Sequence, residues 1–187
     1  MELNMSPEES LRLISDTIKK TRDHLAENSF LFMLWGWLIT IASFSFFALA
    51  YFTDIRFYFL PFPILAASGA VVTTVYFKRK AFSTLTVLSA FLANLWMVLG
   101  IGFFAVVFIQ LSQHQLPFVY TLFIASIGTV TSGLAMKYRP LIWGGLVLFS
   151  SAIICIYVPD TYKVLVHAGG FLCGYLIPGY MLKYSGK

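Results

Sequence analysis

The sequence predicts an all-α membrane protein, a bundle of six transmembrane helices preceded by an amphipathic helix. Hydrophobic residues make up 59% of the 187 residues and charged residues only 11%, where a soluble domain averages about 25%. The charged residues also leave long gaps, each close to or above the ~20 residues that a helix needs to cross a bilayer. These charge-free stretches are Asn28 to Thr53, Phe57 to Phe77, Ala81 to Met136, Pro140 to Pro159 and Val164 to Leu182.

The third charge-free stretch is long enough for two crossings. The polar run Ser112 to Gln115, followed by Pro117, places a turn between them. Residues 29–187 therefore form one six-helix transmembrane domain, whose short connections make consecutive helices antiparallel neighbours. The predicted spans are residues 30–52, 57–77, 82–111, 117–136, 140–158 and 164–182.

The lysines and arginines predict how this bundle is oriented. If the chain crosses back and forth, all but Arg56 and Lys163 of its 13 lysines and arginines fall on one side. Positive charge concentrates in cytoplasmic segments, so both termini are predicted to be cytoplasmic. The net charge of +5 then reflects topology, and we expect the lipid bilayer as a partner and no nucleic acid. The architecture resembles that of small multi-pass proteins of the bacterial inner membrane.

Residues 1–28 are predicted to form a cytoplasmic amphipathic helix. Its polar faces carry acids and bases in near balance, so electrostatic attraction to anionic lipid is weak. The helix either leads into the first span, packs on the protein's own loops, or contacts a second copy or a partner membrane protein. Its apolar stripe consists of Leu11, Ile14, Ile18 and Leu25.

Glycines recur at matching positions, which suggests an internal repeat of three hairpins. Counted back from Lys78, Lys137 and Lys183, the ninth residue is a glycine each time and the fourth is small. Small residues let transmembrane helices approach closely, although glycine is also common in membrane helices without any repeat. The predicted helix-packing residues are Gly69, Gly128, Gly133, Gly174 and Gly179, and the predicted interfacial anchors are Trp35, Trp37 and Trp143.

Polar groups are scarce inside the predicted spans, and no Asp, Glu, Lys or Arg falls within any of them. Asn94 is the most polar residue of the third span, the fourth span is the richest in hydroxyl groups, and His167 lies near the outer end of the sixth. Such side chains either line a path for a polar solute or form hydrogen bonds between helices. The candidate residues are Asn94, Ser126, Thr129, Ser132 and His167.

The sequence carries none of the patterns that we would expect of an enzyme. Paired carboxylates, H-E-x-x-H, G-x-S-x-G, a phosphate-binding loop and a dinucleotide fingerprint are missing. No histidines or cysteines are spaced to hold a metal or a cofactor. We therefore expect a non-catalytic, membrane-embedded interaction or regulatory module that acts through its N-terminal helix. The alternative is a small channel or transporter for a neutral or weakly polar solute.

Overall fold

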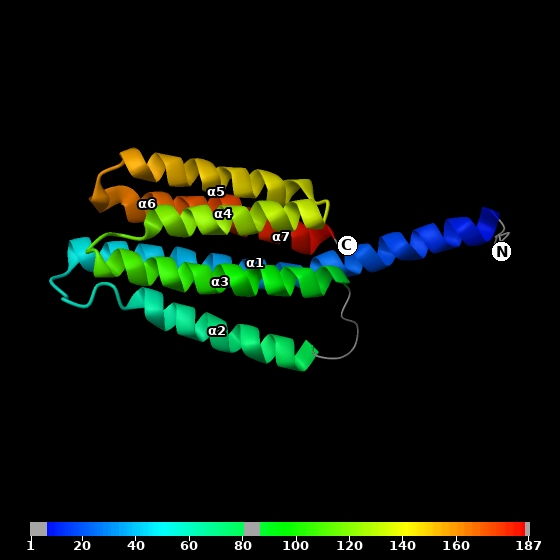
Figure 1. Ribbon diagram of the computed structural model, residues 1–187, viewed down its shortest axis with the longest axis horizontal. Coiled ribbons are helices and arrows are strands. Elements are labelled where there is room, and N and C mark those ends of the chain that lie inside the picture. The colour runs from blue at the N-terminus through cyan, green and yellow to red at the C-terminus, as the bar shows by residue number, and fades with distance from the viewer. Residues whose placement is uncertain (1–6, 81–86, 186–187) are drawn as a thin grey trace.

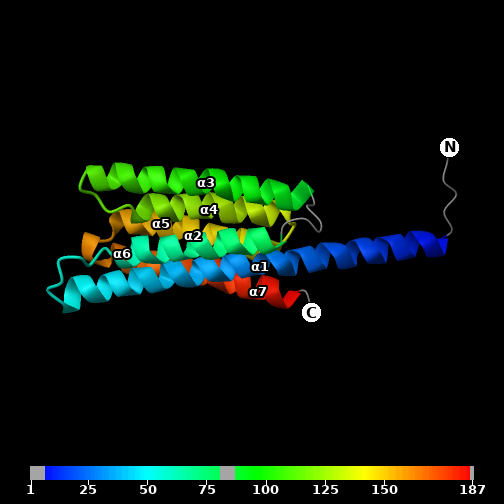
Figure 2. The same cartoon turned by 90° about the horizontal axis from the view of Figure 1, so that it is seen from below.

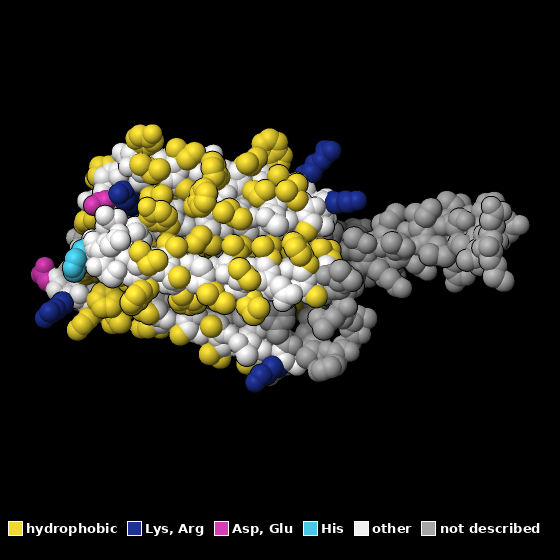
Figure 3. Space-filling view, viewed as in Figure 1, with side chains coloured by type: hydrophobic (Ala, Val, Ile, Leu, Met, Phe, Trp, Pro, Cys, Tyr) yellow, Lys and Arg dark blue, Asp and Glu magenta, His cyan; other side chains and the backbone are white. Residues whose placement is uncertain are grey.

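The computed structural model describes residues 7–80 and 87–185, and every element in these ranges is a helix. Between residues 7 and 28 it describes the backbone alone, so the stripe of Leu11, Ile14, Ile18 and Leu25 lies outside the described side chains. Within these ranges, five helical stretches are long and apolar enough to cross a membrane. Figure 3 shows hydrophobic side chains along the flank of the molecule and charged ones toward its ends. These features indicate a membrane-embedded protein.

Helix α1 runs from Pro7 to Phe52 without a break. It joins the predicted N-terminal helix directly to the first candidate span, Ser29–Phe52. No glycine or proline lies between Pro7 and Ser29 to kink the helix. The N-terminal part of α1 consequently projects well beyond the end of the bundle (Figures 1 and 2).

Helix α2 covers Pro61–Lys80. The predicted start at residue 57 is therefore four residues too early. Residues 56–60 form turns instead. Proline suits the first turn of a helix and disfavours the helical conformation in the residue before it, which explains the later start. The described apolar part of α2, Pro61–Tyr76, is shorter than the ~20 residues of a straight crossing.

The next three helices are α3 (Val87–Ser112), α4 (Phe118–Ala135) and α5 (Arg139–Tyr157). The first residues of the predicted third span, 82–86, lie outside the described residues. Tight turns join α3 to α4 and α4 to α5. His114 and Lys137 adopt positive φ values of 56° and 51° in these turns, which lets the chain reverse within a few residues.

The last candidate span contains three helical segments, α6 (Asp160–Phe171), the π-helical turn η1 (Leu172–Leu176) and α7 (Ile177–Ser185). Pro178 has no N–H to donate to the Gly174 carbonyl, four residues earlier. The π-helical turn ends at Leu176, two residues before this proline. A local change of helix type is a recognised response to such a break in the hydrogen-bond ladder.

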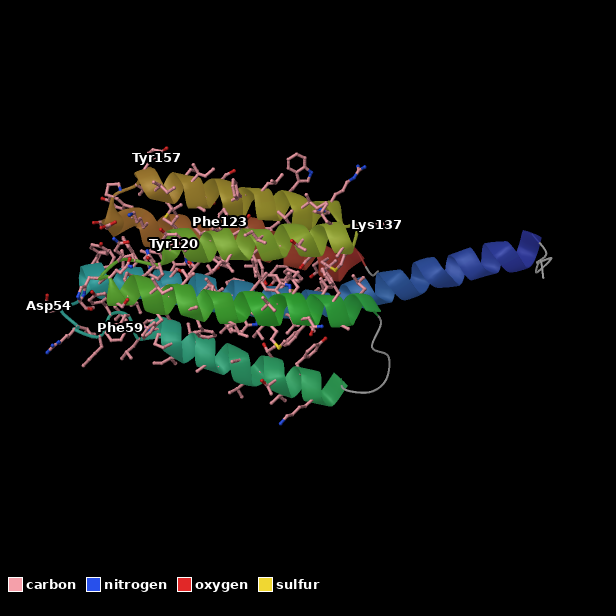
Figure 4. All side chains as sticks on the ribbon, in the orientation of Figure 1. Asp54, Phe59, Tyr120, Phe123, Lys137 and Tyr157 are labelled. Carbon is pink, nitrogen blue, oxygen red and sulfur yellow. The ribbon has the colours of Figure 1, made fainter. Side chains whose placement is uncertain are left out.

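The bundle is tightly packed on one side and open on the other. Helix α4 packs along α5, and α1 packs along α6, η1 and α7, while α2 contacts mainly α1 and α3 contacts mainly α4. Leu122, Leu141, Leu148, Phe171 and Leu182 are fully buried, and all belong to α4–α7. We call the end of the bundle that holds Lys137 the basic end; Asp54 and Tyr157 lie at the opposite end (Figure 4).

Candidate functional site

A buried histidine joins three helices inside the bundle. His167 of α6 is 1% exposed. Its Nδ1 lies 2.9 Å from Ser43 Oγ of α1, and its Nε2 lies 3.0 Å from Thr121 Oγ1 of α4. Ser43 and Thr121 are buried as well. Both ring nitrogens therefore have a hydroxyl partner, and each partner comes from a different helix.

The hydroxyl groups of this triad can serve as donors or as acceptors. Ser43 Oγ lies 2.8 Å from the Ile39 carbonyl, and Thr121 Oγ1 lies 3.0 Å from the Phe118 carbonyl. A neutral imidazole carries one N–H and one bare nitrogen. One hydroxyl thus accepts from the ring and keeps its bond to the backbone, while the other turns its proton toward the ring. The two tautomers of His167 exchange these roles.

Aromatic rings enclose the triad. The His167 ring centroid lies 4.8 Å from that of Phe171, 5.1 Å from Phe118 and 6.1 Å from Phe62. These three rings come from α6, α4 and α2, so α2 also reaches the site at its Pro61 end. In an apolar enclosure, hydrogen bonds between helices contribute about 0.6–2 kcal/mol each. The triad therefore fixes α1, α4 and α6 relative to one another.

Thr40 lies one turn from Ser43 on α1 and is also buried. Its Oγ1 has no hydrogen-bond partner within the described part of the chain. An unsatisfied buried hydroxyl costs about 1–3 kcal/mol. Among the described side chains, no group of three or more His, Cys, Asp or Glu residues could hold a metal ion. The site can join helices and exchange tautomers, and its described residues include no second acid or base beside His167.

The predicted polar residues do not gather around His167. Asn94 is exposed on α3. The three hydroxyl groups of α4 are buried and engaged: Ser126 donates to the Gly145 carbonyl (3.0 Å), Thr129 donates to the Ala125 carbonyl (2.7 Å), and Ser132 accepts from Trp96 Nε1 (3.1 Å).

Sequence analysis did not single out Ser43 and Thr121 as partners of His167. Ser43 lies nine residues before the end of α1, Thr121 three residues into α4, and His167 seven residues into α6. Which hydroxyl groups reach His167 depends on how the three helices lie relative to one another, which a residue count does not contain. Neighbouring hydroxyl groups on α1 and α4 therefore matched His167 equally well.

Two hairpins of the bundle share a second arrangement, in which a tryptophan covers a glycine. In the α1–α2 hairpin, a methyl group on Gly69 would stand 3.1 Å from the Trp35 ring and 2.7 Å from Leu38. Trp35 Nε1 also donates to Thr73 Oγ1, four residues after this glycine, at 3.1 Å. The glycine thus leaves space for the indole, and the hydroxyl group satisfies its N–H.

The α3–α4 hairpin repeats this arrangement. A methyl group on Gly128 would stand 2.8 Å from the Trp96 ring and 2.8 Å from Leu99. Trp96 Nε1 donates to Ser132, again four residues after the glycine, at 3.1 Å. The signal is legible in the sequence as Trp-x-x-Leu on one helix and Gly-x-x-x-Thr or Gly-x-x-x-Ser on the next.

The third hairpin carries the same pattern but packs differently. Trp143 and Leu146 again form Trp-x-x-Leu, yet Trp143 is 68% exposed. Gly144 contacts the Gly174 carbonyl instead, and a methyl group on Gly144 would stand 2.5 Å from Pro178 Cγ. Pro178 occupies the place of the hydroxyl residue and offers the indole no acceptor. This hairpin is held by contact between backbones.

The predicted interfacial anchors have three different environments. Trp35 is half-buried in the α1–α2 contact and Trp143 is exposed. Trp37 donates to Tyr180 Oη at 2.9 Å and lines a shallow groove of about 280 Å³ between α1 and α7. The groove is otherwise lined by Phe30, Met33, Leu34, Leu38 and Lys183, so it suits an apolar chain rather than a polar solute.

No protein family model, curated protein sequence or solved structure matches this chain.

Proposed function

We propose that this protein is a non-catalytic interaction module of a bacterial inner membrane, which presents its N-terminal helix to a partner. The continuity of α1 carries the proposal, because one helix contains both the N-terminal segment and the first candidate span. Residues 7–28 extend about 30 Å at the rise of an α-helix. An unbroken helix transmits the position of its N-terminal part rigidly to the bundle. Binding of a partner there would act on Ser43 and His167 through the same helix.

The proposed topology has six spans, with both termini in the cytoplasm. The C-terminal end of α1 lies at one end of the bundle, and α3 begins at the opposite end (Figure 1). The chain therefore returns along α2. Helix α2 is therefore the second span despite its short apolar part. The proposed cytoplasmic end is the basic end, since Lys78, Lys137 and Lys183 close α2, α4 and α7 there.

The proposed bundle consists of three equivalent hairpins, α1–α2, α3–α4 and α5 with α6–α7. Its support is the contact of Trp35 with Gly69 and of Trp96 with Gly128, each completed by a hydroxyl group four residues later. A repeat of this kind generates several similar helix faces from one pattern. The third hairpin departs from it at Pro178.

The experiment compares the whole chain with a form that lacks residues 7–27, both expressed in membranes. We expect the shortened chain to insert normally and to lose co-purification with its partner, whether another membrane protein or a second copy. A finer comparison replaces Ile18 and Leu25 by glutamine on the stripe, or Asp16 and Asp23 by glutamine on the opposite face. Glutamine is tolerated in helices, so only the stripe variant should lose the partner. Identical assembly of all forms would contradict the proposal.

A solute path has less support. The hydroxyl groups of Ser126, Thr129 and Ser132 are engaged within the protein, and Asn94 lies on the outside of α3. The groove at Trp37 is apolar and lies between α1 and α7 at their basic end. Flux assays with neutral solutes in liposomes should therefore give no protein-dependent transport, and saturable transport would favour the channel or transporter instead.

A further inference from the structure

Each of the three hairpins has a first helix (α1, α3 or α5) and a second one (α2, α4 or α6–α7). The first helix of one hairpin can pack against the second helix of another, which gives three such faces. Helix α1 meets α6–α7, and α5 meets α4. By the same plan, α3 should meet α2. Figure 1 shows α2 diverging from α3 toward the basic end, and many side chains along both helices are exposed. Two of the three faces are therefore filled, and the third is open.

The two filled faces have similar registers, which differ by about one residue when counted from the tryptophan of each hairpin. The fourth residue before the basic lysine is Gly179 in α7 and Gly133 in α4. A methyl group on Gly179 would stand 3.5 Å from the Met33 backbone, and one on Gly133 would stand 3.1 Å from the Leu141 backbone. Met33 and Leu141 each lie two residues before the tryptophan of their hairpin. Both contacts include the same two positions, although the nearest atom belongs to Phe32 in the first face and to Ile142 in the second.

A second crossing point lies about one turn away, and there the registers of the two faces differ by one residue. The seventh residue before the basic lysine is Leu176 in α7 and Val130 in α4. Leu176 Cδ1 would stand 3.0 Å from a methyl group on Gly36, and the Val130 nitrogen would stand 2.8 Å from one on Gly145. Gly36 and Gly145 lie one and two residues after their tryptophans.

The register of α7 on α1 can be transferred to α2 and α3, where it assigns partners on the open face. The fourth residue before Lys78 is Thr74, and the residue two before Trp96 is Asn94. The seventh residue before Lys78 is Val71, and the residue after Trp96 is Met97. Val71 and Met97 are 62% and 60% exposed, whereas the corresponding Leu176 is 5% exposed. Asn94 is also exposed, whereas the corresponding Leu141 is 0% exposed.

We propose that α2 and α3 close on each other as the third face of this plan, with Thr74 against Asn94 and Val71 against Met97. Thr74 Oγ1 donates to the Ala70 carbonyl at 2.8 Å, so its lone pairs can accept from the Asn94 amide. The proposal rests on the three-hairpin plan and explains why the most polar residue of α3 lies on its outer face.

The occupant of the α2 face is α3 of the same chain. Only six residues of sequence separate the end of α2 at Lys80 from the start of α3 at Val87, and so short a connection gives α3 a high effective concentration at α2. The filled faces carry glycines at their crossing points, whereas the open face has Thr74 and Met97 there. The α2–α3 face must therefore close at a wider spacing, through side chains, and it opens more easily.

Disulfide trapping in membranes tests the closure. In a Cys173→Ser background, which leaves only the buried Cys155, Thr74→Cys is combined with Asn94→Cys. The matched control combines Thr74→Cys with Gly102→Cys, about 12 Å farther along α3. Bridged cysteines need α-carbons within about 7 Å, so the first pair should form an intramolecular disulfide at least about tenfold faster than the control.

Three results would overturn the proposal. A covalent dimer from the first pair would make a second copy the occupant of α2. Equal rates for both pairs would show that the two helices have no defined register. No disulfide in either pair, with both cysteines reactive to a small maleimide, would show that the face stays open. None of these results depends on whether residues 7–27 bind a partner, so the two proposals fail separately.

Discussion

Helices α4 and α5 and helices α2 and α3 are consecutive pairs that turn at the same end of the bundle, yet only the first pair meets along its length. Gly133 brings α4 against the backbone of α5, and Gly145 does the same from α5. In the second pair, Thr74 matches Gly133 and Val98 matches Gly145, one residue beyond the Met97 that the register of α7 on α1 gives. The difference indicates that the residue at each crossing point decides which helices pack in lipid, where apolar side chains gain little from leaving the bilayer.

The largest expected effect comes from giving the closed pair the residue of the open one. Gly133→Thr places a β-carbon 2.7 Å from the Ile142 nitrogen, so the backbones must separate. We expect the free energy of unfolding to fall by about 2–4 kcal/mol, measured by denaturation with SDS in mixed micelles. The reciprocal change, Thr74→Gly, separates no backbones, so it should cost only the helix propensity of glycine, about 1 kcal/mol, and about 0.6 kcal/mol for the lost contact with Asn94. Equal losses would contradict the comparison.

The triad at His167 gives the next largest effect, because it lies within the packed side of the bundle. Thr121→Val keeps the shape of the side chain and removes the hydroxyl group that lies 3.0 Å from Nε2. We expect a loss of about 1–2 kcal/mol, and the same from Ser43→Ala. The control Ser68→Ala removes an exposed hydroxyl group bonded only to its own helix. It should stay within about 0.5 kcal/mol of the original chain.

A smaller effect tests the equivalence of the hairpins. Double-mutant cycles pair Trp35→Phe with Thr73→Val, and Trp96→Phe with Ser132→Ala. Both cycles should give a coupling energy of about 0.6 kcal/mol, the usual contribution of a hydrogen bond between transmembrane helices. Trp143→Phe, on an exposed side chain, should change stability by less than about 0.5 kcal/mol. Coupling in one hairpin alone would argue against a repeated arrangement.

Much of the fold could be predicted from the sequence because charges and prolines mark the ends of membrane helices. The predicted spans 117–136 and 140–158 agree within one residue with α4 and α5. Two features depended on backbone detail: α2 begins only at Pro61, and the last span contains a π-helical turn before Pro178. The predicted apolar stripe ends at Leu25, so it did not reveal that α1 continues without a break into the first span.

The candidate site was less predictable. His167 stands out as the ionisable side chain within a charge-free span, but its partners depend on the relative depth of three helices. Asn94 stands out by polarity alone, which does not reveal the direction in which it faces. The glycines aligned from the basic end include Gly69 and Gly128, on which Trp35 and Trp96 pack. The Trp-x-x-Leu pattern became recognisable once Trp35 and Trp96 were found on equivalent glycines.

The central claim is that α2 and α3 form a third face like the two packed ones and close on each other. Its most direct test measures the fraction of molecules in which the two helices are packed together. Spin labels on Val71→Cys and Met97→Cys, in the Cys173→Ser background, are measured in frozen lipid bilayers. Packed helix axes lie about 8–10 Å apart, so the account predicts dipolar broadening of the spectrum from a substantial fraction of the molecules. A spectrum equal to the sum of the two singly labelled proteins would contradict it.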